Sequence, residues 1–139
     1  MTDPDNVSHY LNYTKADMLA VTIGNVHGRY SQPPRLDFDR LAAIRAKAPH
    51  TPLVLHGASG LPKELIEGAV AGGITKFNVN TELRNAAVTA IQDTMVHYGL
   101  RDKVELMHMM QASHKAMMGV AMAKIRLFKY IMQGKDKGY

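Results

Sequence analysis

The chain has 139 residues, 46% of them hydrophobic and 21% charged, with 17 Lys and Arg against 12 Asp and Glu. This composition is typical of a globular protein and excludes low-complexity disorder and collagen-like repeats. The absence of cysteine excludes disulfides, thiolate metal sites and cysteine nucleophiles. No apolar run reaches the roughly 18 residues of a membrane-spanning helix, and the N-terminus lacks the apolar core of a signal peptide. We therefore expect a cytoplasmic protein.

The excess positive charge lies at the C-terminal end. Residues 1–100 hold nine basic and nine acidic side chains, whereas residues 101–139 hold eight basic and three acidic ones. A basic segment can contact nucleic acid or an anionic membrane. Proteins that bind single strands interleave aromatic and basic residues, and that pattern is missing here. We expect neither nucleic acid nor a membrane as a partner, and we interpret residues 129–139 as a basic, flexible tail.

The first half of the chain alternates between helix and strand signals. Thr2-Asp3-Pro4 predicts a helix start, with proline in the first turn. Residues 18–23 form an apolar run of strand length. Asp37 is placed to cap a second helix, which Pro49 ends. Residues 52–55 predict a second strand, again without the alternation that a half-exposed strand would show.

The same alternation continues to residue 128. Pro62 predicts a third helix start, and a third strand follows at residues 74–79. Thr81 is placed to cap the next helix, and a last helical segment covers about residues 102–128. Strands that alternate with helices through short links predict parallel βα units and an α/β fold.

Three polar loops follow the predicted strands, at residues 24–28, 57–60 and 78–81. Ligands of parallel α/β proteins bind at the carboxyl ends of the strands. The three loops are therefore predicted to lie on one face, which is where we expect a functional site.

His27 and His56 each follow a predicted strand, and each precedes a glycine. Imidazole is a common zinc ligand, and two of them on neighbouring loops could share an ion. A lone histidine is, however, more often an ordinary polar residue. A catalytic zinc usually has three protein ligands, and none of the other histidines follows a strand, so a third ligand has to come from elsewhere.

Residues 57–60 have the composition of an anion-binding turn. Glycines allow a close approach of the backbone, and Ser59 adds a hydroxyl donor. A tight turn between a strand and a helix also needs glycine, so this signal has two interpretations. Residues 78–81 form a second candidate anion-binding segment, because a strand there leads into a helix whose first N–H groups are free.

Three segments together resemble the class II, zinc-dependent ketose-bisphosphate aldolases. They are residues 19–28, 53–62 and 76–82, and they occur in the order and spacing of that family. The resemblance extends from about Thr2 to Phe128 and includes the fructose- and tagatose-1,6-bisphosphate enzymes. It implies that residues 1–128 are the C-terminal portion of a TIM (β/α)₈ barrel, with about three parallel βα units and closing helices.

The resemblance also implies a site and a reaction. His27 and His56 would be zinc ligands, and a monovalent cation could bind near Val26 and Gly57. The residues implied to bind the phosphate of dihydroxyacetone phosphate are Gly28, Gly57, Ala58, Ser59, Asn78, Val79, Asn80 and Thr81. The implied reaction, in carbohydrate metabolism and glycolysis, is the reversible aldol cleavage of a ketose 1,6-bisphosphate to dihydroxyacetone phosphate and glyceraldehyde 3-phosphate.

The family's first zinc histidine, its acid/base aspartate and an acidic loop residue would all precede this region. No catalytic acid or base is therefore expected in this chain, which is also shorter than the roughly 250 residues of a closed barrel. We expect a fragment that is inactive alone and needs the N-terminal half of the barrel, with a homo-oligomer as the complete enzyme. Asn80 stands where relatives often have Ala or Asp, which leaves the sugar preference open. The alternative is a non-catalytic phosphate-binding or assembly remnant of the fold.

Overall fold

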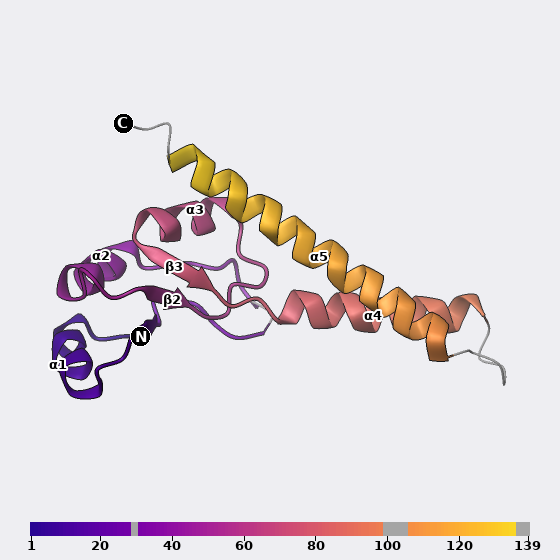
Figure 1. Ribbon diagram of the computed structural model, residues 1–139, viewed down its shortest axis with the longest axis horizontal. Helices are drawn as coiled ribbons and strands as arrows, with labels where there is room; N and C mark the ends of the chain where they lie inside the picture. The colour runs from indigo at the N-terminus through magenta and orange to yellow at the C-terminus, as the bar shows by residue number, and fades with distance from the viewer. Residues whose placement is uncertain (29–30, 99–105, 136–139) are drawn as a thin grey trace. The chain divides into compact units, whose positions relative to one another are not determined.

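The computed structural model describes the backbone of residues 1–28, 31–98 and 106–135 (Figure 1). The chain divides into two compact units, Met1–Val79 and Asn80–Tyr139, and each is described by itself. The elements of the first unit are α1 (Pro4–Thr14), β1 (Leu19–Val21), α2 (Phe38–Lys47), β2 (Leu53–Leu55), α3 (Lys63–Ala71) and β3 (Ile74–Phe77). The second unit contains α4 (Thr81–His97) and α5 (Leu106–Lys135).

The first unit is built around a parallel sheet in the order β1-β2-β3. Leu19 of β1 pairs with Leu53 of β2, and Leu53 pairs with Ile74 of β3. Figure 1 shows β2 and β3 side by side, with α3 between them in the chain. The predicted α/β fold with parallel βα units is confirmed.

The core forms because the apolar runs of the strands meet the inner faces of the helices. All three residues of β2 are buried, as the lack of polar alternation predicts for a central parallel strand. Helix α2 contributes Leu41 and Ile44, and α3 contributes Ile66, all at most 1% exposed. Burying such a side chain is worth about 1.5–3 kcal/mol each.

All three strands are shorter than predicted, and beyond the ends of β1 and β3 the backbone groups form hydrogen bonds with loop residues. β1 ends at Val21, and the N–H of Ile23 donates to the side-chain oxygen of Asn25 instead of to another strand. β3 ends at Phe77, and the carbonyl of Asn78 accepts a hydrogen bond from Ala58 in the loop after β2.

The helix starts follow the sequence with one exception. Asp37 caps α2 as predicted, and its carboxylate accepts a 2.8 Å hydrogen bond from the N–H of Arg40. Thr81 was expected to cap the next helix, but it is the first residue of α4, and Asn80 holds the cap position without a side-chain capping bond. The backbone of Asn80 (φ −133°, ψ −51°) is not helical, which is the condition that defines a cap residue.

In the second unit, α4 and α5 lie side by side (Figure 1) and are joined by a 2.8 Å ion pair between Lys124 and Glu82. Helix α5 extends past residue 128, so residues 129–135 of the expected flexible tail are helical. Ile131, which is 6% exposed and three residues beyond Phe128, continues the helical apolar spacing. Residues 102–105 of the expected helix and residues 136–139 of the tail lie outside the described residues. None of the described helices is both long and apolar enough to cross a membrane.

The cap of α2 makes a prediction about acid stability. The backbone N–H of Arg40, followed by its guanidinium, lowers the pKa of the Asp37 carboxyl. A carboxyl whose pKa is lower in the folded state adds stability above its unfolded pKa, and this stability is lost as the pH falls through the folded value. Asp37→Asn keeps a capping oxygen that does not titrate. We expect its urea midpoint to fall less than that of the wild type on acidification below about pH 4; an equal fall would contradict the assignment.

The open edge of β1 makes a prediction about association. Ala20 and Met18 are exposed there and line a groove of about 520 Å³ together with residues of α1. Within the described residues, β1 pairs only with β2, and an unpaired apolar strand edge promotes association. We expect the chain to self-associate, and Ala20→Lys to shift it toward the monomer in light scattering. A monomeric wild-type chain would contradict this.

Candidate functional site

The candidate site begins where the loop after β3 joins the loop after β2. The N–H of Asn78 donates to the carbonyl of Leu55 at 3.0 Å, and the N–H of Ala58 donates to the carbonyl of Asn78 at 3.3 Å. These bonds fix two of the three predicted loops against each other at the carboxyl edge of the sheet. They also engage the N–H of Ala58, a residue implied to bind phosphate.

Asn25 fastens the loop after β1 to the same edge. Its side chain, in a residue only 8% exposed, accepts from the N–H of Ile23 at 2.8 Å and donates to the carbonyl of His56 at 3.1 Å. A buried amide with both ends paired is a strong local constraint. Sequence reasoning assigned Asn25 no role, because its partner His56 lies 31 residues away.

Gly57 explains why the loops after β1 and β2 can approach so closely. Its φ is +63°, and a Cβ atom at this position would overlap the carbonyl oxygen and carbon of Val26. Only glycine satisfies both conditions without displacement of the backbone. Val26 and Gly57, the two residues proposed to flank a monovalent cation, are therefore in contact.

This approach brings His27 and His56 together. Their ring centroids are 5.5 Å apart, with an angle of 67° between the rings. Two imidazoles bound to one tetrahedral zinc ion, each with a bond of about 2.0–2.1 Å, would have centroids about 5 Å apart. His27 is exposed and His56 half-buried, so their rings can be reached from solvent. The donor chemistry and the spacing of this pair fit zinc.

A third protein ligand is not part of this pair. Among residues 1–28, 31–98 and 106–135, no three His, Cys, Asp or Glu side chains are grouped as a metal site would need. The assignment of His27 and His56 as metal ligands therefore stays a prediction.

The loop after β3 also faces His56. The side-chain nitrogen of Asn78 lies 3.4 Å from Nδ1 and 3.3 Å from Nε2 of that ring. His27, His56 and Asn78, which belong to three different loops, are therefore neighbours. A metal on the histidines and an anion on the amide could be held side by side.

The remaining residues implied to bind phosphate are placed in two groups. Ala58 and Ser59 are buried in the turn before α3, and Gly28 has a φ of +96° with open space around it. Val79 is half-buried at the end of the first unit. Asn80 and Thr81 begin α4 in the second unit.

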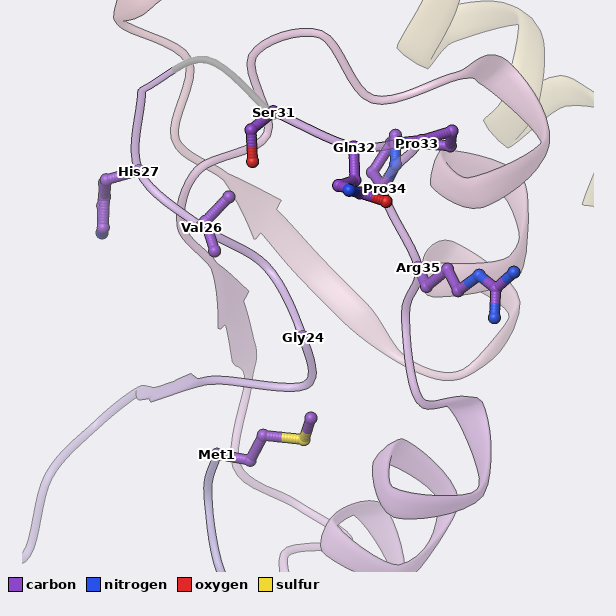
Figure 2. A pocket seen from close by; sticks show the side chains of 9 residues that line it. All are labelled: Met1, Gly24, Val26, His27, Ser31, Gln32, Pro33, Pro34 and Arg35. Carbon is purple, nitrogen blue, oxygen red and sulfur yellow. The ribbon is translucent and has the colours of Figure 1, made fainter.

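A cavity of about 790 Å³ adjoins His27. Figure 2 shows that its wall comes from Met1 and from two arms of one loop, with Gly24, Val26 and His27 on one arm and Ser31 to Arg35 on the other. Its volume lies within the range of about 300–1,000 Å³ that small-molecule sites occupy. Ser31 and Arg35, to which the sequence assigned no role, belong to this wall.

The contact between Gly57 and Val26 can be tested with two alanine variants. Gly57→Ala is expected to push the loop after β1 away and to separate His27 from His56. Gly60→Ala is the control, because Gly60 also has a positive φ (+77°) but nothing within 4 Å of an added Cβ. The measurement is the NMR contact between the two imidazole rings, expected to be lost in the first variant and kept in the second. Its retention in both variants would show that the close approach does not pair the histidines.

The comparisons with known proteins agree in their outcome. The class-II fructose-bisphosphate aldolase family model matches residues 1–133. YdjI of Escherichia coli (strain K12) is 39% identical over 127 residues, which are 91% of this chain and 43% of YdjI. The crystal structure of the YdjI aldolase matches with a TM-score of 0.75 at 37% identity, over 91% of this chain and 44% of that one.

Two further crystal structures match over similar lengths. A putative fructose-1,6-biphosphate aldolase from Coccidioides immitis is 30% identical, with a TM-score of 0.67 over 86% of this chain and 42% of that chain. The fructose-bisphosphate aldolase of Campylobacter jejuni is 19% identical, with a TM-score of 0.64 over 91% and 45%, and supports the fold alone. The chain spans less than half the length of these relatives, and its βα units are part of an α/β TIM barrel. The chain belongs to the class-II fructose-bisphosphate aldolase family.

Proposed function

We propose that this chain is part of a zinc-dependent ketose-bisphosphate aldolase, to which it contributes two metal ligands and the loops that bind phosphate. The observation that carries the proposal is the pairing of His27 and His56, whose ring centroids are 5.5 Å apart in the loops that follow two adjacent strands. Family membership supplies the class of reaction.

The proposed reaction is the reversible cleavage of a ketose 1,6-bisphosphate to dihydroxyacetone phosphate and glyceraldehyde 3-phosphate. A zinc ion held by His27 and His56 would supply Lewis-acid polarisation of the ketose carbonyl. The residues proposed to hold the phosphate are Gly28, Gly57, Ala58, Ser59, Asn78, Val79, Asn80 and Thr81. Binding a group remote from the reacting carbons orients the substrate. The translational and rotational entropy is then lost on binding and no longer adds to the barrier of the chemical step.

The turn before α3 supports the phosphate assignment. Gly57 and Gly60 have positive φ values of +63° and +77°, and turns that combine such residues with ordinary ones form concave nests of N–H groups that bind anions. Ser59 lies between them and is 6% exposed. A hydrogen bond to a charged oxygen inside such a turn is about twice as strong as one between neutral groups.

The carbon–carbon bond is broken only if a group accepts the proton of the neighbouring hydroxyl. We propose that this group, and a further zinc ligand, come from a segment other than residues 1–139. A positioned acid or base contributes about 10²–10⁴ in rate. The 139-residue chain alone should therefore show no measurable turnover, and the complete enzyme, which we propose to be a homo-oligomer, should show it.

The metal assignment is tested by calorimetric titration of the chain with zinc chloride. His27→Ala and His56→Ala should each weaken zinc binding by about tenfold or more, because each removes a ligand. His9→Ala is the matched control, since His9 is an exposed histidine on α1. Equal zinc binding in all four proteins would contradict the assignment.

The reaction is tested by joining this chain to the part of YdjI that it does not match. We expect cleavage of fructose or tagatose 1,6-bisphosphate that a chelator abolishes and that His56→Ala removes. Full turnover and full zinc content in His56→Ala would refute the proposal. Phosphate binding without zinc binding or cleavage would instead support the phosphate-binding remnant.

A further inference from the structure

Lys76 lies on β3, two residues before Asn78, and its ammonium group donates a hydrogen bond to Oδ1 of Asn78. We propose that Lys76 is a positioning residue: it holds the amide of Asn78 with its NH₂ end toward His56, where an anionic ligand would meet a donor. This inference rests on the proposed function for the identity of the ligand, but not for the orientation of the amide.

The strand geometry explains how Lys76 reaches Asn78. Residues two apart in an extended chain point to the same side of the sheet. Lys76 is exposed and Asn78 is half-buried, so the lysine approaches from the solvent side while the amide extends toward the ring of His56. There the amide nitrogen lies 3.4 and 3.3 Å from the two ring nitrogens.

The chemistry of the two groups decides the orientation. An amide has an acceptor end and a donor end of nearly equal size, whereas an ammonium has only donors. Only the oxygen of Asn78 can satisfy Lys76. A flipped amide would set two donors against each other and turn its oxygen toward His56. Lys76 therefore favours the observed orientation, with the NH₂ end of Asn78 toward His56. Without Lys76, the amide would adopt this orientation only part of the time.

The selected orientation matters for an anion beside the histidines. A phosphate or enolate oxygen there would meet an N–H donor in the observed orientation, and a repelling carbonyl oxygen in the flipped one. A donor fixed before the ligand arrives costs no reorganisation on binding. Fixing the amide should thus strengthen anion binding at this edge of the sheet.

The orientation is tested by NMR on the 139-residue chain. The readout is the nuclear Overhauser effect (NOE) between the amide protons of Asn78 and Hε1 of His56, which lies between the two ring nitrogens. We expect it in the wild type, in Lys76→Arg, which keeps a donor, and in Lys47→Met, a control at an exposed lysine of α2. It should weaken at least about twofold in Lys76→Met, where the donor that fixes the amide is lost.

An undiminished NOE in Lys76→Met, or none in the wild type, would overturn the proposal. Loss in both Lys76→Arg and Lys76→Met would also overturn it, because the hydrogen bond would then not be the cause.

The consequence for binding is tested with inorganic phosphate as the probe. Lys76→Met should weaken phosphate binding about tenfold, the scale of a hydrogen bond to a charged group. In an Asn78→Ala background the same change should add less than about twofold, because the lysine acts through that amide. A full second tenfold loss would show that the ammonium contacts phosphate itself, and no loss in either background would show that the orientation is without effect; both outcomes overturn the proposal.

If the wild-type chain does not bind phosphate, the proposed function loses its anion site. The NOE comparison then still decides whether Lys76 orients Asn78.

Discussion

The parallel pairing of β1, β2 and β3 is the constraint on which the candidate site depends. Parallel strands that are joined by helices end at the same edge of the sheet, so the loops that follow them become neighbours. The three residues of β2 are all buried, which holds the central strand of this arrangement inside the core. His27, His56 and Asn78 are brought together by this pairing and not by their spacing in the chain.

Specific contacts between the loops then fix their positions more closely than the strand pairing does. Asn25 joins Ile23 to His56 through one buried amide, and Gly57 lies against the carbonyl of Val26, where no other residue fits. Each hydrogen bond adds only about 1 kcal/mol. Their effect on geometry is larger, because two metal ligands on separate loops bind one ion only when both loops are held in place.

The candidate site in the described residues is a pair of histidines on neighbouring loops. The chain spans 43% of YdjI, and its described residues pair two histidines without grouping three metal-binding side chains. The strand edge at β1 carries exposed apolar residues beside a groove. The histidine pair, with the loops proposed to bind phosphate, is supported by Asn25, Gly57 and Lys76, all within the first unit.

The sequence by itself determined the alternation of strands and helices, the cap at Asp37, and the position of His27 and His56 after strands. These features are local: apolar runs, capping residues and glycines act within a few positions of each other. The contacts that support the site were decided by the tertiary structure. Asn25 bonds to a residue 31 positions away and Asn78 to one 22 positions away. Such pairs leave no periodic signal, and strand ends shift when side chains replace the ladder bonds, as Asn25 does at Ile23. The cap of α4 and the end of α5 also differ from the prediction, because a helix boundary depends on backbone angles and burial that the residue types alone do not fix.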